Sequence, residues 1–135
     1  MPRRLFLLLC LLLQLPGRAQ DGRELALWKS IKRALLGPHG DEYFEMSMKN
    51  AMLPTLHGRV VRLEPAANPR TVVLAIEDGA TPDATLRFDR PLPGKVEAGT
   101  ELSFEGVAES YTANPFMVVF EVYPDHLHGW PDHSG

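Results

Sequence analysis

The chain has 135 residues and a formal net charge of −3. This length predicts a single domain, large enough to bury a core of its own. The acidic charge argues against a nucleic-acid partner, because affinity for phosphates depends largely on lysines and arginines that displace counterions.

The N-terminus has the pattern of a cleavable export signal. Two arginines precede an apolar run over residues 5–13, and Gly17 and Ala19 place small residues three and one positions before a cut after Ala19. The apolar run is too short to cross a bilayer as a helix. We therefore expect residues 1–19 to be a signal peptide and the mature protein to be periplasmic or secreted, with no transmembrane span.

Removal of this signal would also remove the single cysteine, Cys10. A lipidated cysteine follows a small residue, whereas Leu9 precedes Cys10, so we do not expect a lipid anchor. The mature chain of 116 residues would lose three arginines and carry a net charge of −6. Without cysteine it can form neither disulfides nor thiolate metal sites, and it has no cysteine nucleophile.

Two helices are expected in the segment 20–55. The first is predicted over 23–36, with Asp21 as its N-cap and a Gly-Pro pair at its end. The second is predicted over 41–52, where apolar residues recur every four positions. Both helices have an apolar face that can cover the rest of the domain. On the first helix this face consists of Leu27, Trp28, Ile31 and Leu35.

The remainder of the chain changes to a period of two. Alternating apolar residues, rich in aromatic and β-branched types, predict five strands, and turn-forming segments separate them. We assign the domain to residues 56–124 and a C-terminal tail to residues 125–135. The predicted strands are 58–63, 71–77, 84–89, 101–109 and 116–123.

Five antiparallel strands with these spacings resemble an OB-fold, a partly open Greek-key barrel. Gly58 and Gly106 would suit the strong bends of a small barrel. Segment 91–99 is too rich in proline and glycine for the helix that usually lies between the third and fourth strands. The predicted fold is therefore mostly β: a five-stranded OB-fold-like Greek-key barrel with two N-terminal α-helices. A small β-sandwich and an open meander with helices on one face are the alternatives.

More narrowly, the chain resembles small exported bacterial OB-fold-like proteins of uncharacterised function. In that group the helices precede the barrel, as predicted here. The stretch 102–107, followed by Tyr111, the segment 115–117 and Trp130, also resembles secreted proteins of this kind. The resemblance implies a fold and an exported location, but it implies no activity.

The OB-fold resemblance also implies a ligand face, flanked by the loop between strands one and two and the loop between strands four and five. On this chain the loops are 64–70 and 111–116. Aromatic residues there would contact a sugar, peptide or protein by stacking. The alternative is that Tyr111 and Phe116 pair across the hairpin and only stabilise it. The candidate ligand-binding residues are Arg62, Arg70, Tyr111, Asn114 and Phe116.

The C-terminal tail offers a second candidate site. His126, His128 and His133 could bind zinc or copper through their imidazole nitrogens. If residues 125–128 are extended, His126 and His128 point to the same side. Their spacing matches no established metal motif, however. The acidic turn over 77–83 lacks the alternating ligand series of a calcium loop, and we expect it to be an ordinary turn with solvated carboxylates.

No nucleophile elbow or metalloprotease motif is present in the sequence. We expect a monomeric, non-catalytic binding module without a cofactor, whose partner is a protein, peptide or glycan of the cell envelope. One alternative is a small metal-binding or stress-related envelope protein that uses the tail histidines. The other is an enzyme of unknown reaction.

Overall fold

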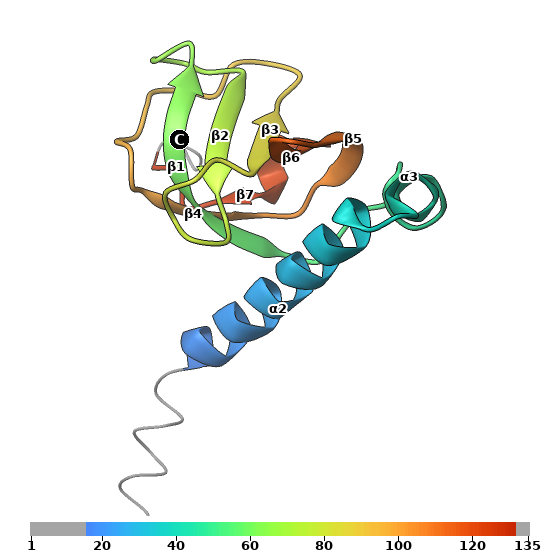
Figure 1. The fold of residues 1–135 in the computed structure, drawn as a ribbon. Coiled ribbons are helices and arrows are strands. Elements are labelled where there is room, and N and C mark those ends of the chain that lie inside the picture. Colours follow the sequence, from blue (N-terminus) through green and yellow to red (C-terminus); the bar gives the residue numbers. More distant parts are fainter. Residues whose placement is uncertain (1–15, 132–135) are drawn as a thin grey trace, which may run out of the picture.

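The fold is mostly β, with two α-helices at its N-terminal side, as expected from the sequence (Figure 1). A computed structural model describes residues 16–131. Helix α2 (Pro16–Leu36) is followed by the short helix α3 (Gly40–Tyr43), which continues into a π-helical turn (Phe44–Met48). Seven strands follow: β1 (Leu56–Glu64), β2 (Thr71–Ala75), β3 (Ala84–Arg87), β4 (Glu101–Phe104), β5 (Val107–Ala113), β6 (Phe116–Glu121) and β7 (Leu127–His128).

Helix α2 begins earlier than the sequence predicts. The helix starts at Pro16, so Asp21 lies inside it and the predicted N-cap at Asp21 is wrong. Proline suits the first helical position because its φ is already helical and its missing N–H needs no partner there. The last four residues of the expected signal peptide thus belong to α2. The rest of that segment, including Cys10, lies outside the described residues.

The strands of the described region form one open, mixed sheet in the order β5-β6-β3-β2-β1-β4-β7. Neighbouring strands are antiparallel, except that β3 and β6 are parallel. The expected number of five strands is therefore wrong, since the predicted strand 101–109 is interrupted at Glu105 and Gly106 and part of the tail adds β7. A Cβ on Gly106 would lie 3.1 Å from atoms of Phe120 and Val122, so β6 passes close to the backbone at this break.

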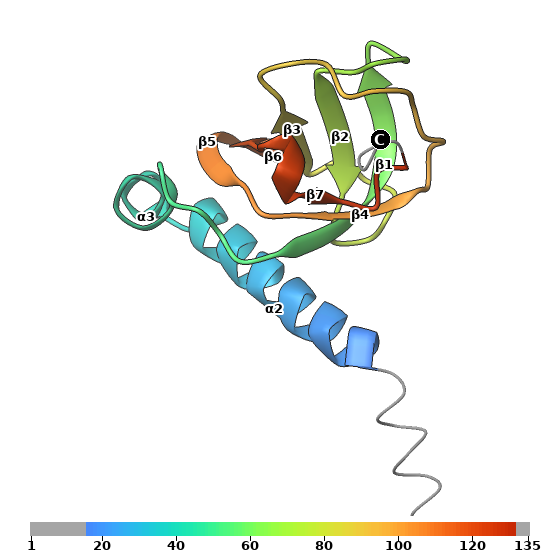
Figure 2. The same cartoon turned by 180° about the vertical axis from the view of Figure 1, so that it is seen from behind.

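The core lies inside the curved sheet and beneath α2. The predicted apolar face of α2 is confirmed, because Trp28, Ile31 and Leu35 are all buried. Leu127 and Trp130, from the segment expected to be a tail, are buried as well. In both views the N-terminal part of α2 projects beyond the sheet, whereas its C-terminal part lies against it (Figures 1 and 2).

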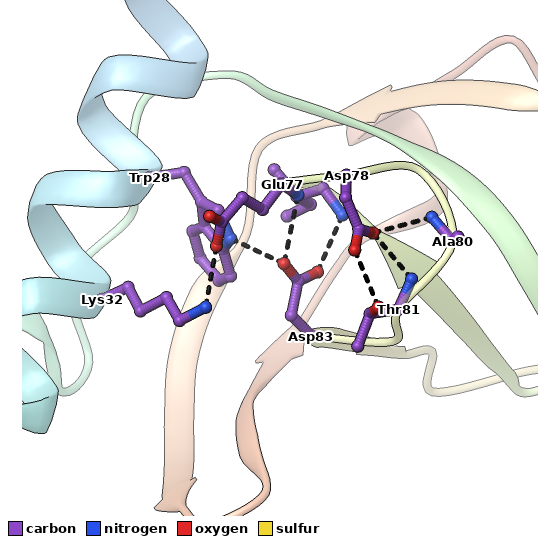
Figure 3. A network of polar contacts seen from close by, with 8 residues as sticks. Trp28, Lys32, Glu77, Asp78, Ala80, Thr81 and Asp83 are labelled. Atoms are coloured by element: carbon purple, nitrogen blue, oxygen red, sulfur yellow. Dashed lines mark hydrogen bonds and ion pairs between the residues drawn. The ribbon is translucent and has the colours of Figure 1, made fainter.

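A polar cluster fastens α2 to the loop between β2 and β3 (Figure 3). The buried carboxylate of Asp83 accepts hydrogen bonds from the Trp28 indole (2.9 Å) and from the backbone N–H groups of Ile76 (2.7 Å) and Glu77 (3.1 Å). Lys32 forms an ion pair with Glu77 at 2.8 Å. These contacts fix the position of the helix along the sheet.

None of the helices in residues 16–131 combines the length and the apolar character needed to cross a bilayer.

Candidate functional site

The two loops expected to flank a ligand lie at opposite ends of the sheet. The pairing of β2 with β3 aligns Thr71 with Arg87, so Arg70 lies at the end of β3 where that strand finishes. The parallel pairing of β3 with β6 aligns Ala84 with Val118, so Phe116 lies beyond the start of β3. At about 3.3 Å per residue, the length of the strands separates these loops. The structure therefore does not bring Arg70 and Phe116 together.

The two aromatic residues of the predicted site contact the helical segments. The Tyr111 ring lies 5.2 Å from the Phe44 ring, and its hydroxyl donates a hydrogen bond to Asp41 at 2.5 Å. The Phe116 ring lies 5.8 Å from the ring of Trp28. Tyr111 and Phe116 do not face each other across the hairpin, since their register partners are Val118 and Ala113. In the structure these aromatic side chains help to hold the helices on the sheet.

The polar members of the predicted site are exposed but scattered. Arg62 donates a hydrogen bond to Glu64 at 2.7 Å. Arg70 is exposed after the loop between β1 and β2, and Asn114 is exposed at the tip of the β5–β6 hairpin. They share no contact that would define a common binding surface.

The tail histidines do not adopt the arrangement on which the metal hypothesis depends. Residues Pro124–His126 form a 3-10 turn, so the extended backbone over 125–128 that would point His126 and His128 to the same side is not present. The ring of His126 lies against Tyr123, whereas His128 Nε2 lies 2.9 Å from a carboxylate oxygen of Glu105. His133 lies outside the described residues. Within residues 16–131, no three His, Cys, Asp or Glu side chains are grouped so that they could hold a metal ion.

A different feature lies where the parallel strands β3 and β6 end. Two surface hollows, of about 470 and 360 Å³, both include Tyr123 in their walls. Because β3 and β6 run in the same direction, the residues that follow them meet at one end of the sheet. We call the two hollows together the Tyr123 groove. Its walls consist of residues 87–93, residues 121–126, Asn50, Val107 and Glu109.

Tyr123 stands at the junction of the two hollows. It is 62% exposed, and it is one of few large apolar side chains in the described region to be so accessible. Its ring meets that of His126 edge to face, with centroids 5.9 Å apart. The buried residues Phe88, Leu92 and Val122 contribute an apolar floor. An exposed ring above an apolar floor provides a stacking surface.

The rim of the Tyr123 groove has more acidic than basic side chains. Arg87 forms an ion pair with Glu109 at 2.5 Å. A hydrogen bond to Glu109 and repulsion by its charge raise the pKa of Glu121, against the opposing effect of Arg87. Two arginines face four carboxylates here, since Arg90, Asp89 and Asp125 complete the charged lining. The groove therefore carries excess negative charge.

The sequence contained one signal for this site. In the strand that became β6, the buried residues Val118, Phe120 and Val122 alternate, and Tyr123 falls out of phase with them. A tyrosine on the outward side of a strand end, directly before a proline, is therefore exposed. The sequence did not indicate that the segment after β3 lies beside it, because this depends on the parallel pairing of two strands about 30 residues apart.

Comparisons of the chain with protein-family models, with curated proteins and with solved structures found no match. The Tyr123 groove combines an aromatic stacking surface, an apolar floor and directed polar groups. Such a combination is typical of ligand-binding sites, in which apolar walls supply affinity and a few polar groups fix the orientation of the ligand.

Proposed function

We propose that the protein is an exported, monomeric, non-catalytic binding module whose ligand lies in the Tyr123 groove. The ligand would be a protein, peptide or glycan of the cell envelope. The observation that carries the proposal is the position of Tyr123, which is exposed at the junction of two hollows. The export pattern of residues 1–19 supports a periplasmic or secreted location.

We further propose that the architecture is an interrupted OB-fold-like barrel. Suppose that residues 101–113 are counted as one bent strand. Neighbouring strands then pair in an unbroken series, β1 with β2, β2 with β3, β3 with β6 and β6 with β5. The bent strand then returns through β4 to β1. This ring of pairings is incomplete only at Glu105 and Gly106, and a partly open barrel is characteristic of the OB-fold. The β7 pairing is an addition at the edge.

The proposal is tested by binding to arrays of peptides and envelope glycans. The wild type should retain at least one ligand that Tyr123→Ala loses, because the substitution removes the stacking ring from the groove. Loss of one aromatic contact should weaken binding by about 1–3 kcal/mol, roughly 5-fold to 150-fold. Tyr123 is mostly exposed, so its replacement should leave the fold intact, which circular dichroism would verify.

The matched control is Met46→Ala, which truncates another exposed apolar side chain on the π-helical turn. This variant should bind as the wild type does. Equal binding by wild type and Tyr123→Ala for every retained ligand would remove the groove from consideration. Saturable turnover of a retained ligand, lost on replacing one polar groove residue, would favour an enzyme instead.

A further inference from the structure

We infer that the Tyr123 groove binds a basic side chain of an extended peptide, with Glu121 as the carboxylate that receives the positive charge. This inference rests on the proposed function and specifies its ligand class. The occupant is argued from charge complementarity between the groove and an arginine or lysine.

Glu121 lies opposite Arg87 in the register of β6 and β3, but the ion pair of Arg87 is with Glu109. Arg87 lies 2.5 Å from Glu109, so this ion pair occupies Glu109. Glu121 lines the same hollow as Glu109, and the charge of Glu109 contributes to a raised pKa of the Glu121 carboxyl group. A guanidinium or ammonium group placed beside Glu121 would relieve this repulsion and form a charge-assisted hydrogen bond.

Tyr123 is oriented to contact the same cation. Glu121 is the last residue of β6, and Tyr123, two positions later, still has extended backbone angles. Side chains two positions apart on an extended chain project to the same side. Both residues line the hollow of about 360 Å³. A cation near Glu121 would therefore lie within reach of the face of an aromatic ring, which attracts positive charge.

The walls of this hollow also suit the aliphatic part of a basic side chain. Phe88, Val107 and Val122 line it together with the carboxylates. Lysine and arginine bury their methylene groups along apolar surface while the charged end reaches a polar partner. The adjoining hollow, lined by Pro91, Pro93 and Pro124, would receive the flanking residues of the peptide.

A neutral glycan would use the same stacking ring, but it would leave the excess negative charge of the rim uncompensated. The rim has four carboxylates and two arginines, and both arginines are already paired with groove carboxylates. The charge balance therefore favours a basic peptide over a neutral sugar. A glycan ligand becomes an outcome of the test.

The test is an NMR titration of the purified protein, used as the producing cell processes it. The probes are Nα-acetyl-arginine amide and Nα-acetyl-lysine amide. Nα-acetyl-glutamine amide serves as the uncharged probe. At about 0.15 M salt, where the Debye length is about 8 Å, only short-range charge contacts persist. The basic probes should cause saturable shifts in the amide signals of residues 87–93 and 121–126, whereas the glutamine probe should not.

Glu121→Gln should weaken binding of the basic probes roughly tenfold, about 1.4 kcal/mol. The matched control is Glu101→Gln, which removes one carboxylate at the other end of the sheet, where Glu101 pairs with Arg59 beside Ala75. This control should bind as the wild type does. Equal shifts with the glutamine probe, or equal losses in the two variants, would overturn the inference.

The arrays separate this failure from failure of the proposed function. A glycan or acidic peptide that the wild type retains and Tyr123→Ala loses, without any response to the basic probes, would overturn the basic-peptide inference alone. If no array ligand depends on Tyr123 and the basic probes leave the groove signals unchanged, both proposals fall.

Discussion

Asp83 shows how one side chain connects a helix to a sheet. Among residues 22–131 it is the only buried charged residue, with 5% of its surface exposed. Burial raises the pKa of its carboxyl group, whereas hydrogen bonds from Ile76, Trp28 and Glu77 act in the opposite direction. Three N–H donors converge on this one carboxylate, so its loss would leave all three without that acceptor.

We expect Asp83→Ala to lower the free energy of unfolding by about 3 kcal/mol, because each buried donor left unpaired costs about 1–3 kcal/mol before relaxation. Urea unfolding followed by tryptophan fluorescence would measure the change, and Trp28 itself reports on the site. Asp89→Ala, at an exposed position, should change stability by less than about 0.5 kcal/mol. Similar losses in both variants would contradict the assigned role of Asp83.

The sequence alone did not indicate this role. The expectation of solvated carboxylates in the segment 77–83 is wrong at Asp83, which is buried and accepts a hydrogen bond from Trp28. Asp78 accepts hydrogen bonds from the backbone N–H groups of Ala80 and Thr81, which lower its pKa to about 2. Asp83 differs from Asp78 in being buried beneath Trp28, which is 55 residues away in the chain. Such long-range pairing leaves no local pattern.

The pKa of Glu121 is raised, as is that of Asp83, but its substitution should have the opposite effect on stability. A hydrogen bond and repulsion from Glu109 raise its pKa in the folded state. Stability from a group with a raised pKa is present below the unfolded pKa and is lost as the pH rises through the folded pKa. At pH 7 the ionised form of Glu121 therefore destabilises the fold. Glu121→Gln should raise the urea midpoint at pH 7, and this gain should shrink towards pH 4.

Glu101→Gln provides the comparison for this measurement, because Glu101 lies near two basic side chains, Arg59 and His57. It should not raise the midpoint at pH 7. A lower midpoint for Glu121→Gln at pH 7 would show that Arg87 outweighs Glu109 in the folded protein. A carboxylate that is unfavourable for stability and yet lines a groove is consistent with selection for binding.

At the scale of elements, local periodicity predicted which face of a helix or strand is apolar. It did not predict where the helices and strands begin and end. The apolar face of α2 followed from helical spacing, and alternation located most strands. The alternation of apolar residues did not indicate the interruption at Glu105 and Gly106, since Leu102 and Phe104 continue it up to that point, and Gly106 indicated only a bend. It arises because β4 pairs with β1 whereas β5 pairs with β6.

The corner between α2 and α3 depends on a residue without a side chain. A Cβ at Gly40 would lie 2.1 Å from the carbonyl oxygen of Leu35, so Gly40→Ala requires the backbone to shift. We expect a loss of about 1–3 kcal/mol, as for other overpacked sites. Gly22, inside α2, has nothing within 4 Å of the same position. Gly22→Ala should stabilise the helix by up to about 1 kcal/mol.

Thermal unfolding of these two variants compares the same change of one methyl group in two helical settings. A lower melting temperature for Gly40→Ala and an equal or higher one for Gly22→Ala is the expected pair of results. An equal melting temperature for Gly40→Ala and the wild type would contradict the close approach of Gly40 to the Leu35 carbonyl oxygen.

At the scale of the whole molecule, helix docking and the Tyr123 groove occupy opposite ends of one strand pair. Asp83, which holds α2 through its hydrogen bond with Trp28, directly precedes the start of β3 at Ala84. The groove begins at Arg87, where β3 ends. The predicted ligand face failed to form a single surface for the same reason, because its two loops belong to these two ends. The sequence located the loops, but their separation depends on strand pairing. We therefore expect substitutions in the Tyr123 groove to leave the docking of α2 unchanged.

The contacts that hold α2 on the sheet would remain after removal of the expected signal peptide. Trp28, Ile31 and Leu35, which dock α2, all follow the expected cut after Ala19. Cleavage would shorten the projecting end of α2 and leave its buried face intact. We therefore expect the exported protein to begin at Gln20 and to remain folded. Intact mass spectrometry of the purified exported chain would measure where it begins.

Ala19→Leu should block the cut, because the position before the cleavage site requires a small residue. Ala26→Leu, at an exposed position of α2 beyond the cut, should be processed normally. An exported chain that retains residues 1–19 would identify α2 as the continuation of a membrane-proximal segment, and it would place the Tyr123 groove on a tethered protein.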